Sequence, residues 1–238
     1  MILISRPKEQ SVELKLLLNS NGYKCLHENF YNIKYYKKKN FYIKNNYYIF
    51  SSIHSVKSLI KNNQINKFFE ARIFVVGEQV KKLLINSGCK NIVATLEDGN
   101  SLLDFLVKKN LHRSKLIHFC SNIANEDFVQ KSISHNISIE RMIVYKTIPI
   151  ENFTINLIDK LRFNKVTGIV FYSKLAVNTF LNLTIKSEIL INPETINMYC
   201  ISERVSKPLK LKNFSNIYIA KKPNQKSLVQ AIIKHHIV

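Results

Sequence analysis

Short apolar runs alternate with segments of helical spacing along the whole chain. Residues 1–5 form an apolar run, residues 10–20 carry apolar positions at helical spacing, and residues 24–28 are again strand-like. The same alternation continues from residue 47 to 146 and from residue 155 to 235. Strands that alternate with helices predict parallel sheets covered by helices on both faces, so the expected fold class is α/β.

The spacing predicts the individual elements. In the middle of the chain we expect strands at residues 47–50, 72–76, 91–94, 115–119 and 139–146, with helices at 55–61, 80–86, 101–109 and 126–135. Towards the end we expect helices at 155–161, 176–183, 203–209 and 227–235, with strands at 168–172, 196–201 and 216–220.

One strand–turn–helix pattern occurs twice. The sequence Ile-Phe-Ser-Ser-Ile-His-Ser-Val at residues 49–56 resembles Val-Phe-Tyr-Ser-Lys-Leu-Ala-Val at residues 170–177. The similarity continues downstream, where residues 72–84 align with 197–209 and residues 1–28 have a partner in 115–146. We therefore expect two similar α/β units that arose by duplication.

The order of the repeated pieces predicts a split domain. One unit runs continuously over residues 35–146, whereas the matching unit is assembled from residues 1–33 and 150–238. The expected architecture is two flavodoxin-like domains with parallel sheets, the first of them discontinuous. Residues 30–46 and 146–154 would be the two connections between the domains.

Residues 30–48 are crowded with Tyr, Lys and Asn. Such a segment could be a basic, aromatic surface for nucleic acid. The alternative, which we favour, is a solvated connector or an extended ribbon between the two domains.

Composition narrows the class of ligand. The 238-residue chain is 46% hydrophobic and has a net charge of +20, yet only six of its 36 basic residues are Arg. Arg is the preferred residue for bidentate contacts to phosphate and guanine, so we do not expect nucleic acid as a partner. The charge still favours an anionic ligand.

The remaining composition indicates a cytoplasmic protein. No apolar run is long enough to span a bilayer, and the first residues resemble a strand rather than a signal peptide, so we expect no membrane association. The four cysteines are scattered without metal-ligand spacing and are expected to be reduced and mostly buried. We expect no metal, and His235 and His236 are expected to lie in a solvated tail.

Small polar residues follow most of the predicted strands. Ligands of open parallel sheets bind outside the carboxyl ends of the strands, where helix N-termini offer free N–H groups. The candidates for ligand binding are Arg6, Ser51, Ser52, Gly77, Glu78, Ser121, Asn122, Tyr172, Ser173, Lys174 and Ser202. Two such edges facing each other would form a cleft suited to a ligand with many carboxylates. Alternatively, the serines are plain helix N-caps.

The ordered set of motifs resembles the uroporphyrinogen-III synthase family. The resemblance rests on Ile-Leu-Ile-Ser-Arg-Pro at residues 2–7, Phe-Ser-Ser at 50–52, Val-Val-Gly at 75–77, Ile-Val-Tyr-Lys-Thr at 143–147, Phe-Tyr-Ser at 171–173 and Ser-Leu-Val at 227–229. It implies two α/β domains joined by a two-stranded ladder, with the active site in a cleft between them.

The resemblance also implies the reaction. The substrate would be hydroxymethylbilane, a linear tetrapyrrole with eight carboxylates, which the enzyme cyclises to uroporphyrinogen III by loss of water and inversion of ring D. No cofactor is implied. The enzyme is expected to be a monomer that receives its substrate by a transient hand-over from hydroxymethylbilane synthase.

Two residues acquire expected roles from the resemblance. Tyr145 matches the tyrosine of the family's V-Y-x-T motif and would donate a hydrogen bond to the leaving hydroxyl; alternatively, it packs as an aromatic residue at a strand end beside the hinge. Arg6 matches the family's strand-end arginine and would pair with a substrate carboxylate or hold the cleft.

The sequence departs from the family pattern in several turns. The family usually has Thr after each V-G or I-G, but the turns here read Gly-Glu-Gln-Val at residues 77–80 and Ser-Glu-Arg-Val at 202–205, and Asn125 replaces a frequent basic residue. Carboxylate contacts would then come from backbone amides, Arg204 and Lys174. The departures keep open an alternative function, a non-catalytic two-domain protein that binds a polycarboxylate.

Overall fold

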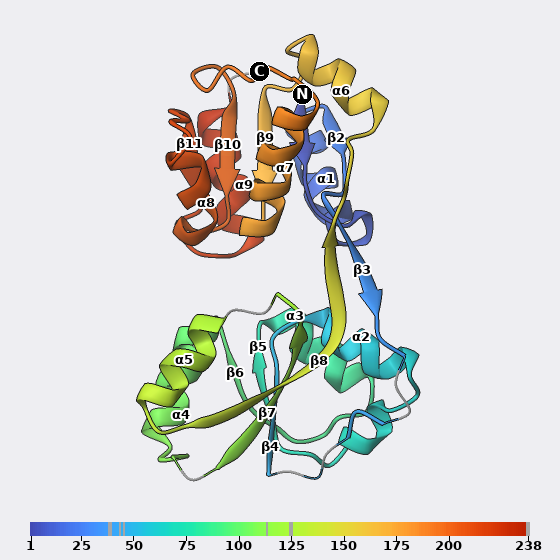
Figure 1. The fold of residues 1–238 in the computed structure, drawn as a ribbon, viewed down its shortest axis with the longest axis vertical. Helices are drawn as coiled ribbons and strands as arrows, with labels where there is room; N and C mark the ends of the chain where they lie inside the picture. The colour runs from blue at the N-terminus through green and yellow to red at the C-terminus, as the bar shows by residue number, and fades with distance from the viewer. Residues whose placement is uncertain (38–39, 43, 45, 113, 124–125, 237–238) are drawn as a thin grey trace. The chain divides into compact units, whose positions relative to one another are not determined.

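The computed structural model describes residues 1–37, 40–42, 44, 46–112, 114–123 and 126–236, so Lys38, Lys39 and Asn125 lie outside the described residues. The chain divides into two compact units (Figure 1). Unit 1 comprises Met1–Asn32 and Ile148–Val238, and unit 2 comprises Ile33–Thr147. Among the described residues, no helix combines the length and apolarity that crossing a membrane requires.

Unit 1 is a five-stranded parallel sheet with helices on both faces. Its elements in chain order are β1 (Ile2–Ile4), α1 (Lys8–Ser20), β2 (Cys25–His27), α6 (Ile155–Arg162), β9 (Gly168–Phe171), α7 (Lys174–Lys186), β10 (Asn197–Cys200), α8 (Glu203–Lys210), β11 (Ile217–Ile219) and α9 (Gln225–His235). The strand order β2-β1-β9-β10-β11 is that of flavodoxin-like sheets.

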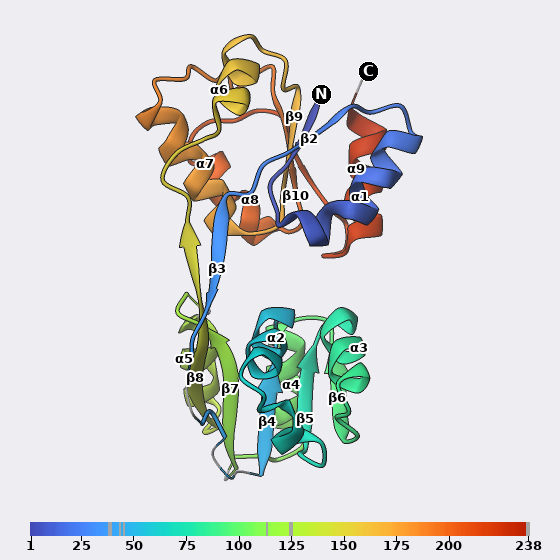
Figure 2. The same ribbon diagram turned by 90° about the vertical axis from the view of Figure 1, so that its right-hand side faces the viewer.

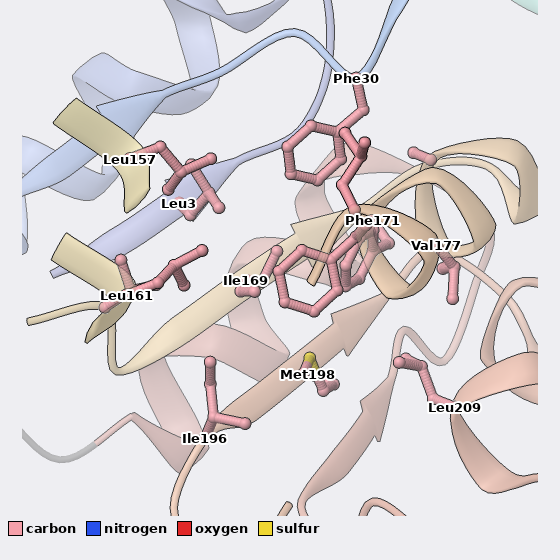
Figure 3. Packing of buried hydrophobic residues seen from close by; sticks show 14 of the residues in the cluster. Leu3, Phe30, Leu157, Leu161, Ile169, Phe171, Val177, Ile196, Met198 and Leu209 are labelled. Carbon is pink, nitrogen blue, oxygen red and sulfur yellow. The ribbon is translucent and has the colours of Figure 1, made fainter. Parts of the chain in front are cut away.

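Alternating side chains of these strands fill two separate cores. Leu3 packs with α6, α7 and α8 on one face, together with Phe171 and Met198 (Figure 3). Its neighbours Ile2 and Ile4 pack with α1 and α9 on the other face. Both faces are buried, which explains why the strands read as continuous apolar runs in the sequence.

Unit 2 repeats this topology and adds one strand. Its elements are β3 (Tyr31–Tyr35), β4 (Tyr47–Phe50), α2 (Ile53–Lys61), the 3₁₀ helix η1 (Ile65–Phe68), β5 (Ile73–Val76), α3 (Glu78–Asn86), β6 (Ile92–Leu96), α4 (Gly99–Lys108), β7 (Lys115–Ser121), α5 (Glu126–Ser134) and β8 (Ser138–Pro149). The order β8-β7-β4-β5-β6 corresponds strand by strand to that of unit 1, which confirms the expected repeat.

Strands β3 and β8 form the predicted two-stranded ladder, and Figures 1 and 2 both show them side by side. The Tyr36 N–H donates to the Val144 carbonyl (3.1 Å), and the Ile150 N–H donates to the Phe30 carbonyl (3.2 Å). The residue number falls along β8 as it rises along β3, so the pair is antiparallel. The predicted fold class is confirmed.

The extended ribbon expected after residue 30 is confirmed, because β3 joins the sheet of unit 2 as a sixth strand. The segment is not a solvated connector throughout, because Phe30 is fully buried beside Phe153 and Phe180. One expectation from the sequence was wrong. His236 is not in a solvated tail. It is buried, and its ring nitrogens are hydrogen-bonded to Tyr199 and Thr167.

Candidate functional site

The carboxyl ends of β4 and β7 lie side by side in unit 2, and serines follow β4 and end β7. Ser52 caps helix α2, because its Oγ accepts a hydrogen bond from the His54 N–H (3.1 Å). Ser121 is the last residue of β7 and is buried. The sequence correctly predicted that parallel strands would bring these two hydroxyls to one edge of the sheet.

Tyr145 lies at the same edge. It is the partner of Ser121 across β7 and β8, just beyond a shift in strand register, and only 7% of it is exposed. Burial raises the pKa of Tyr145, while hydrogen bonds to Ser52 and Ser121 partly oppose the increase. The phenol is therefore protonated at neutral pH. Tyr145 does not end its strand as expected, because β8 continues to Pro149.

Two aromatic residues that the sequence did not single out complete this cluster. The Tyr35 hydroxyl and His54 Nδ1 are hydrogen-bonded at 2.9 Å. The Tyr145 ring lies 5.6 Å from the His54 ring and 6.5 Å from the Tyr35 ring, measured between centroids. The position of His54 in the first turn after a capping serine was the available signal. Tyr35 was not singled out, because residues 30–48 were expected only as a connector or ribbon, with no contact assigned to their side chains.

Ser51 is exposed and is paired with a buried histidine. Its Oγ lies 2.7 Å from Nε2 of His118, and 7% of His118 is exposed. Burial lowers the pKa of His118 to about 4, and the positive charge of Arg141 contributes to the decrease. His118 was also missed, although a single polar residue within the apolar run of residues 116–119 was a visible signal.

The other two predicted turns of unit 2 are occupied by internal contacts. The Gly77 N–H donates to the Leu96 carbonyl (2.9 Å), and the exposed Glu78 carboxylate lies 3.9 Å from Lys81. The Asn122 side-chain oxygen accepts a hydrogen bond from the Thr147 N–H (2.9 Å). The Gly77 N–H and the Asn122 side chain therefore hold neighbouring strands together.

Unit 1 places Arg6 against Tyr172 at the ends of the neighbouring strands β1 and β9. The Arg6 guanidinium lies 4.1 Å from the centre of the Tyr172 ring and donates to Gln10 Oε1 (2.8 Å). His27 donates from Nε2 to the Arg6 carbonyl oxygen (2.6 Å). Burial raises the pKa of Tyr172, and the charge of Arg6 opposes the increase.

The remaining predicted residues of unit 1 lie at two helix N-termini. Ser173 caps α7, because its Oγ accepts from the Ala176 N–H (3.2 Å), and Lys174 beside it is exposed. Ser202 occupies the N-cap position of α8 without making a side-chain capping hydrogen bond, and Arg204 in the first turn is exposed. Exposed positive charge near a helix N-terminus favours an anion.

The described part of the chain contains no group of three or more His, Cys, Asp or Glu side chains placed to hold a metal ion. Cys89, Cys120 and Cys200 are buried as free thiols, and Cys25 is half-buried.

Comparison with known proteins identifies a family. A model of the family described as uroporphyrinogen-III synthase HemD matches residues 12–230. None of the curated proteins compared with the sequence matches it. The crystal structure of uroporphyrinogen-III synthetase from Helicobacter pylori is similar, with a TM-score of 0.67, 16% identity and 98% of each chain covered. A mutant uroporphyrinogen III synthase from the extremely thermophilic bacterium Thermus thermophilus has a TM-score of 0.59, 11% identity and 98% of each chain covered.

Proposed function

Because this chain belongs to the uroporphyrinogen-III synthase family, we propose that it cyclises hydroxymethylbilane to uroporphyrinogen III with loss of water and inversion of ring D. The family implies a cyclising lyase of haem biosynthesis. The proposed reaction uses no cofactor, and the proposed enzyme acts as a cytoplasmic monomer that accepts the bilane by transient hand-over from hydroxymethylbilane synthase.

The observation that supports this reaction best is the environment of Tyr145. Its buried hydroxyl is hydrogen-bonded to Ser52 and Ser121 at the carboxyl edge of the sheet, and burial keeps it protonated. A neutral phenol can donate a hydrogen bond to a departing hydroxyl group, and donors of this kind typically contribute about 10²- to 10⁴-fold to a rate.

In the proposed mechanism, Tyr145 donates a hydrogen bond to the hydroxymethyl oxygen of the substrate. The carbon–oxygen bond breaks as the departing hydroxyl takes up a proton from solvent, water leaves, and an azafulvene cation remains. The substituted carbon of ring D attacks this cation to form a spiro intermediate, after which ring D inverts and the macrocycle closes with release of one proton to solvent. Most of the catalytic effect would come from holding a flexible bilane in one conformation.

The substrate carboxylates would be bound by positive charges and by hydrogen-bond donors at the ends of strands. Arg6, Lys174 and Arg204 supply the charges. The net charge of +20 would also attract an eight-carboxylate substrate from solution. The other proposed binding residues are Ser51, Ser52, Gly77, Glu78, Ser121, Asn122, Tyr172, Ser173 and Ser202.

A second candidate function is a non-catalytic protein that binds a polycarboxylate. It is favoured by the turns at residues 77–80 and 202–205, which lack the Thr that the family usually has there, whereas the exposed positive charges of Lys174 and Arg204 remain.

The decisive experiment supplies freshly prepared hydroxymethylbilane to the purified protein. After oxidation, the ratio of isomer III to isomer I is measured by chromatography. The proposed activity predicts a large excess of isomer III over the enzyme-free control. A ratio equal to that of the control, accompanied by saturable binding of the bilane, would instead support the binding protein.

A further inference from the structure

His118 is a polar side chain in the middle of an apolar strand. In the register of the sheet it lies opposite Ile49 on β4 and opposite Arg141 on β8. Its ring contacts the Phe128 ring of helix α5 edge-on, with centroids 5.6 Å apart. Burying a polar side chain in this way destabilises the fold unless its polar atoms are hydrogen-bonded. The hydrogen-bond partner of the His118 ring is therefore important for its burial.

That partner is the exposed Ser51, the first residue after β4. The 2.7 Å contact between Ser51 Oγ and His118 Nε2 joins a surface hydroxyl to a ring that is fixed by the strand and by Phe128. Ser52, the next residue, caps α2 and reaches Tyr145. The His118 ring therefore fixes the orientation of the Ser51 hydroxyl, which lies immediately beside the proposed reaction site.

The protonation of the pair decides what Ser51 can offer to a ligand. A neutral imidazole carries one proton, on either Nε2 or Nδ1. If Nε2 carries it, His118 donates to Ser51 Oγ and the Ser51 hydroxyl proton is available to an incoming acceptor. If Nδ1 carries it, Ser51 donates to the ring and has no proton to offer. A carboxylate at Ser51 would select the first arrangement, because an ionised carboxylate only accepts hydrogen bonds.

We propose that His118 is a positioning residue that donates its Nε2 proton to Ser51 and thereby directs the Ser51 hydroxyl at a carboxylate of the substrate. The inference rests on the proposed function, because the carboxylate belongs to the bilane. It adds a buried residue that has no need to touch the substrate and that determines how well Ser51 binds it. Binding through Ser51 persists in the transition state, so its loss raises KM and leaves kcat unchanged.

The kinetic test is a cycle of Ser51→Ala, His118→Leu and the double variant. A lost hydrogen bond to a carboxylate is expected to raise KM about tenfold in Ser51→Ala and in His118→Leu, with kcat within about twofold of wild type. The double variant is expected to show no further increase in KM, because both changes remove one shared interaction. An unchanged KM in His118→Leu, or additive effects in the double variant, would overturn the role of His118.

Two further variants distinguish a positioning role of His118 from a purely structural one. His118→Gln places an amide group at the same number of bonds from the backbone as Nε2, so it is expected to restore KM to within about threefold of wild type. Ser87→Ala removes the hydroxyl of the C-cap residue of α3, which donates to the Leu83 carbonyl of that helix (2.7 Å), and it is expected to leave KM unchanged. An elevated KM in His118→Gln equal to that of His118→Leu would contradict the hydrogen-bonding role.

A spectroscopic test uses the wild-type protein and is independent of how the variants fold. Protein with ¹⁵N-labelled histidine is mixed with uroporphyrin III, the stable oxidised form of the product, and the His118 resonances are identified by their absence in His118→Gln. The proposal predicts that Nε2 of His118 carries the proton in the complex. A proton on Nδ1 would overturn it. A wild-type protein that gives no excess of isomer III would instead reject the proposed function.

Discussion

Replacing Tyr145 by Phe tests the proposed hydrogen-bond donor with the smallest possible change. Only the hydroxyl is lost, and the ring keeps its neighbours Tyr35 and His54. Ser52 and Ser121 each lose one hydrogen bond, although Ser52 still accepts from a backbone N–H. At about 0.5–1.5 kcal/mol for each hydrogen bond, the free energy of unfolding should fall by about 1–3 kcal/mol.

Catalysis should be affected as well as stability. Removing the hydrogen-bond donor from the leaving hydroxyl should lower kcat about 100-fold, which corresponds to about 2.7 kcal/mol of transition-state stabilisation. KM should change by less than about threefold, because Tyr145 would act on the leaving group rather than on a carboxylate. The assay is steady-state turnover of hydroxymethylbilane with separation of isomers III and I, accompanied by urea unfolding of the same preparation.

Tyr199→Phe is the matched control. Tyr199 is a fully buried tyrosine of unit 1 whose hydroxyl is hydrogen-bonded to His236 Nδ1 (3.1 Å), so the same group is removed from an equally buried position outside the proposed site. Its stability should fall by about 1 kcal/mol while kcat stays at the wild-type value. A folded Tyr145→Phe variant with wild-type kcat would refute the role of Tyr145 as hydrogen-bond donor to the leaving group.

Three further predictions concern pH, backbone conformation and charge. The pKa of His118 is about 4 in the folded protein and about 6.5 when unfolded, so the folded state with neutral His118 is most stable above pH 6.5. The free energy of unfolding should fall by about 3 kcal/mol as the pH falls to 4. Urea unfolding as a function of pH should show a smaller decrease in His118→Gln. Gly22→Ala and Gly88→Ala both place Ala at positive φ and should each lower the free energy of unfolding by about 1–2 kcal/mol. The decrease should be greater at Gly88, where the new Cβ would lie 2.8 Å from the Phe69 ring, and thermal unfolding measures both. Arg6→Gln should raise KM about tenfold by removing a charge that binds a carboxylate, and an unchanged KM would exclude that role.

The parts of the fold that depend on local pattern could be predicted from the sequence. The apolar runs at residues 2–4, 49–50 and 168–171 specify buried parallel strands because both faces of those strands are covered. Serine before a helical segment correctly predicted the caps Ser52 and Ser173. Arg6 and Tyr172 were both expected at strand ends, and the pairing of β1 with β9 places them side by side.

Features that depend on distant contacts were not predictable in the same way. Strand β3 alternates half-buried Tyr31, Ile33 and Tyr35 with exposed residues, but its high content of Tyr, Lys and Asn concealed that period. His236 is buried because Tyr199 and Thr167 lie beside it in the folded unit, and no local sequence pattern predicts such partners. For the same reason, the hydrogen bond between Ser51 and His118 appears only once β4 and β7 are paired.

The insertion of unit 2 between β2 and α6 has a consequence for synthesis of the chain. The β1-α1-β2 piece emerges from the ribosome before unit 2, but Leu14 and Leu18 are buried against partners such as Val170 and Ile232, which emerge only after unit 2. At ordinary rates of translation, synthesis of unit 2 takes roughly 6 to 25 seconds. Unit 2 is continuous and can fold during that interval, whereas the first 32 residues expose an unpaired strand and apolar helix face. The greatest risk of aggregation therefore falls on the N-terminal piece of the nascent chain.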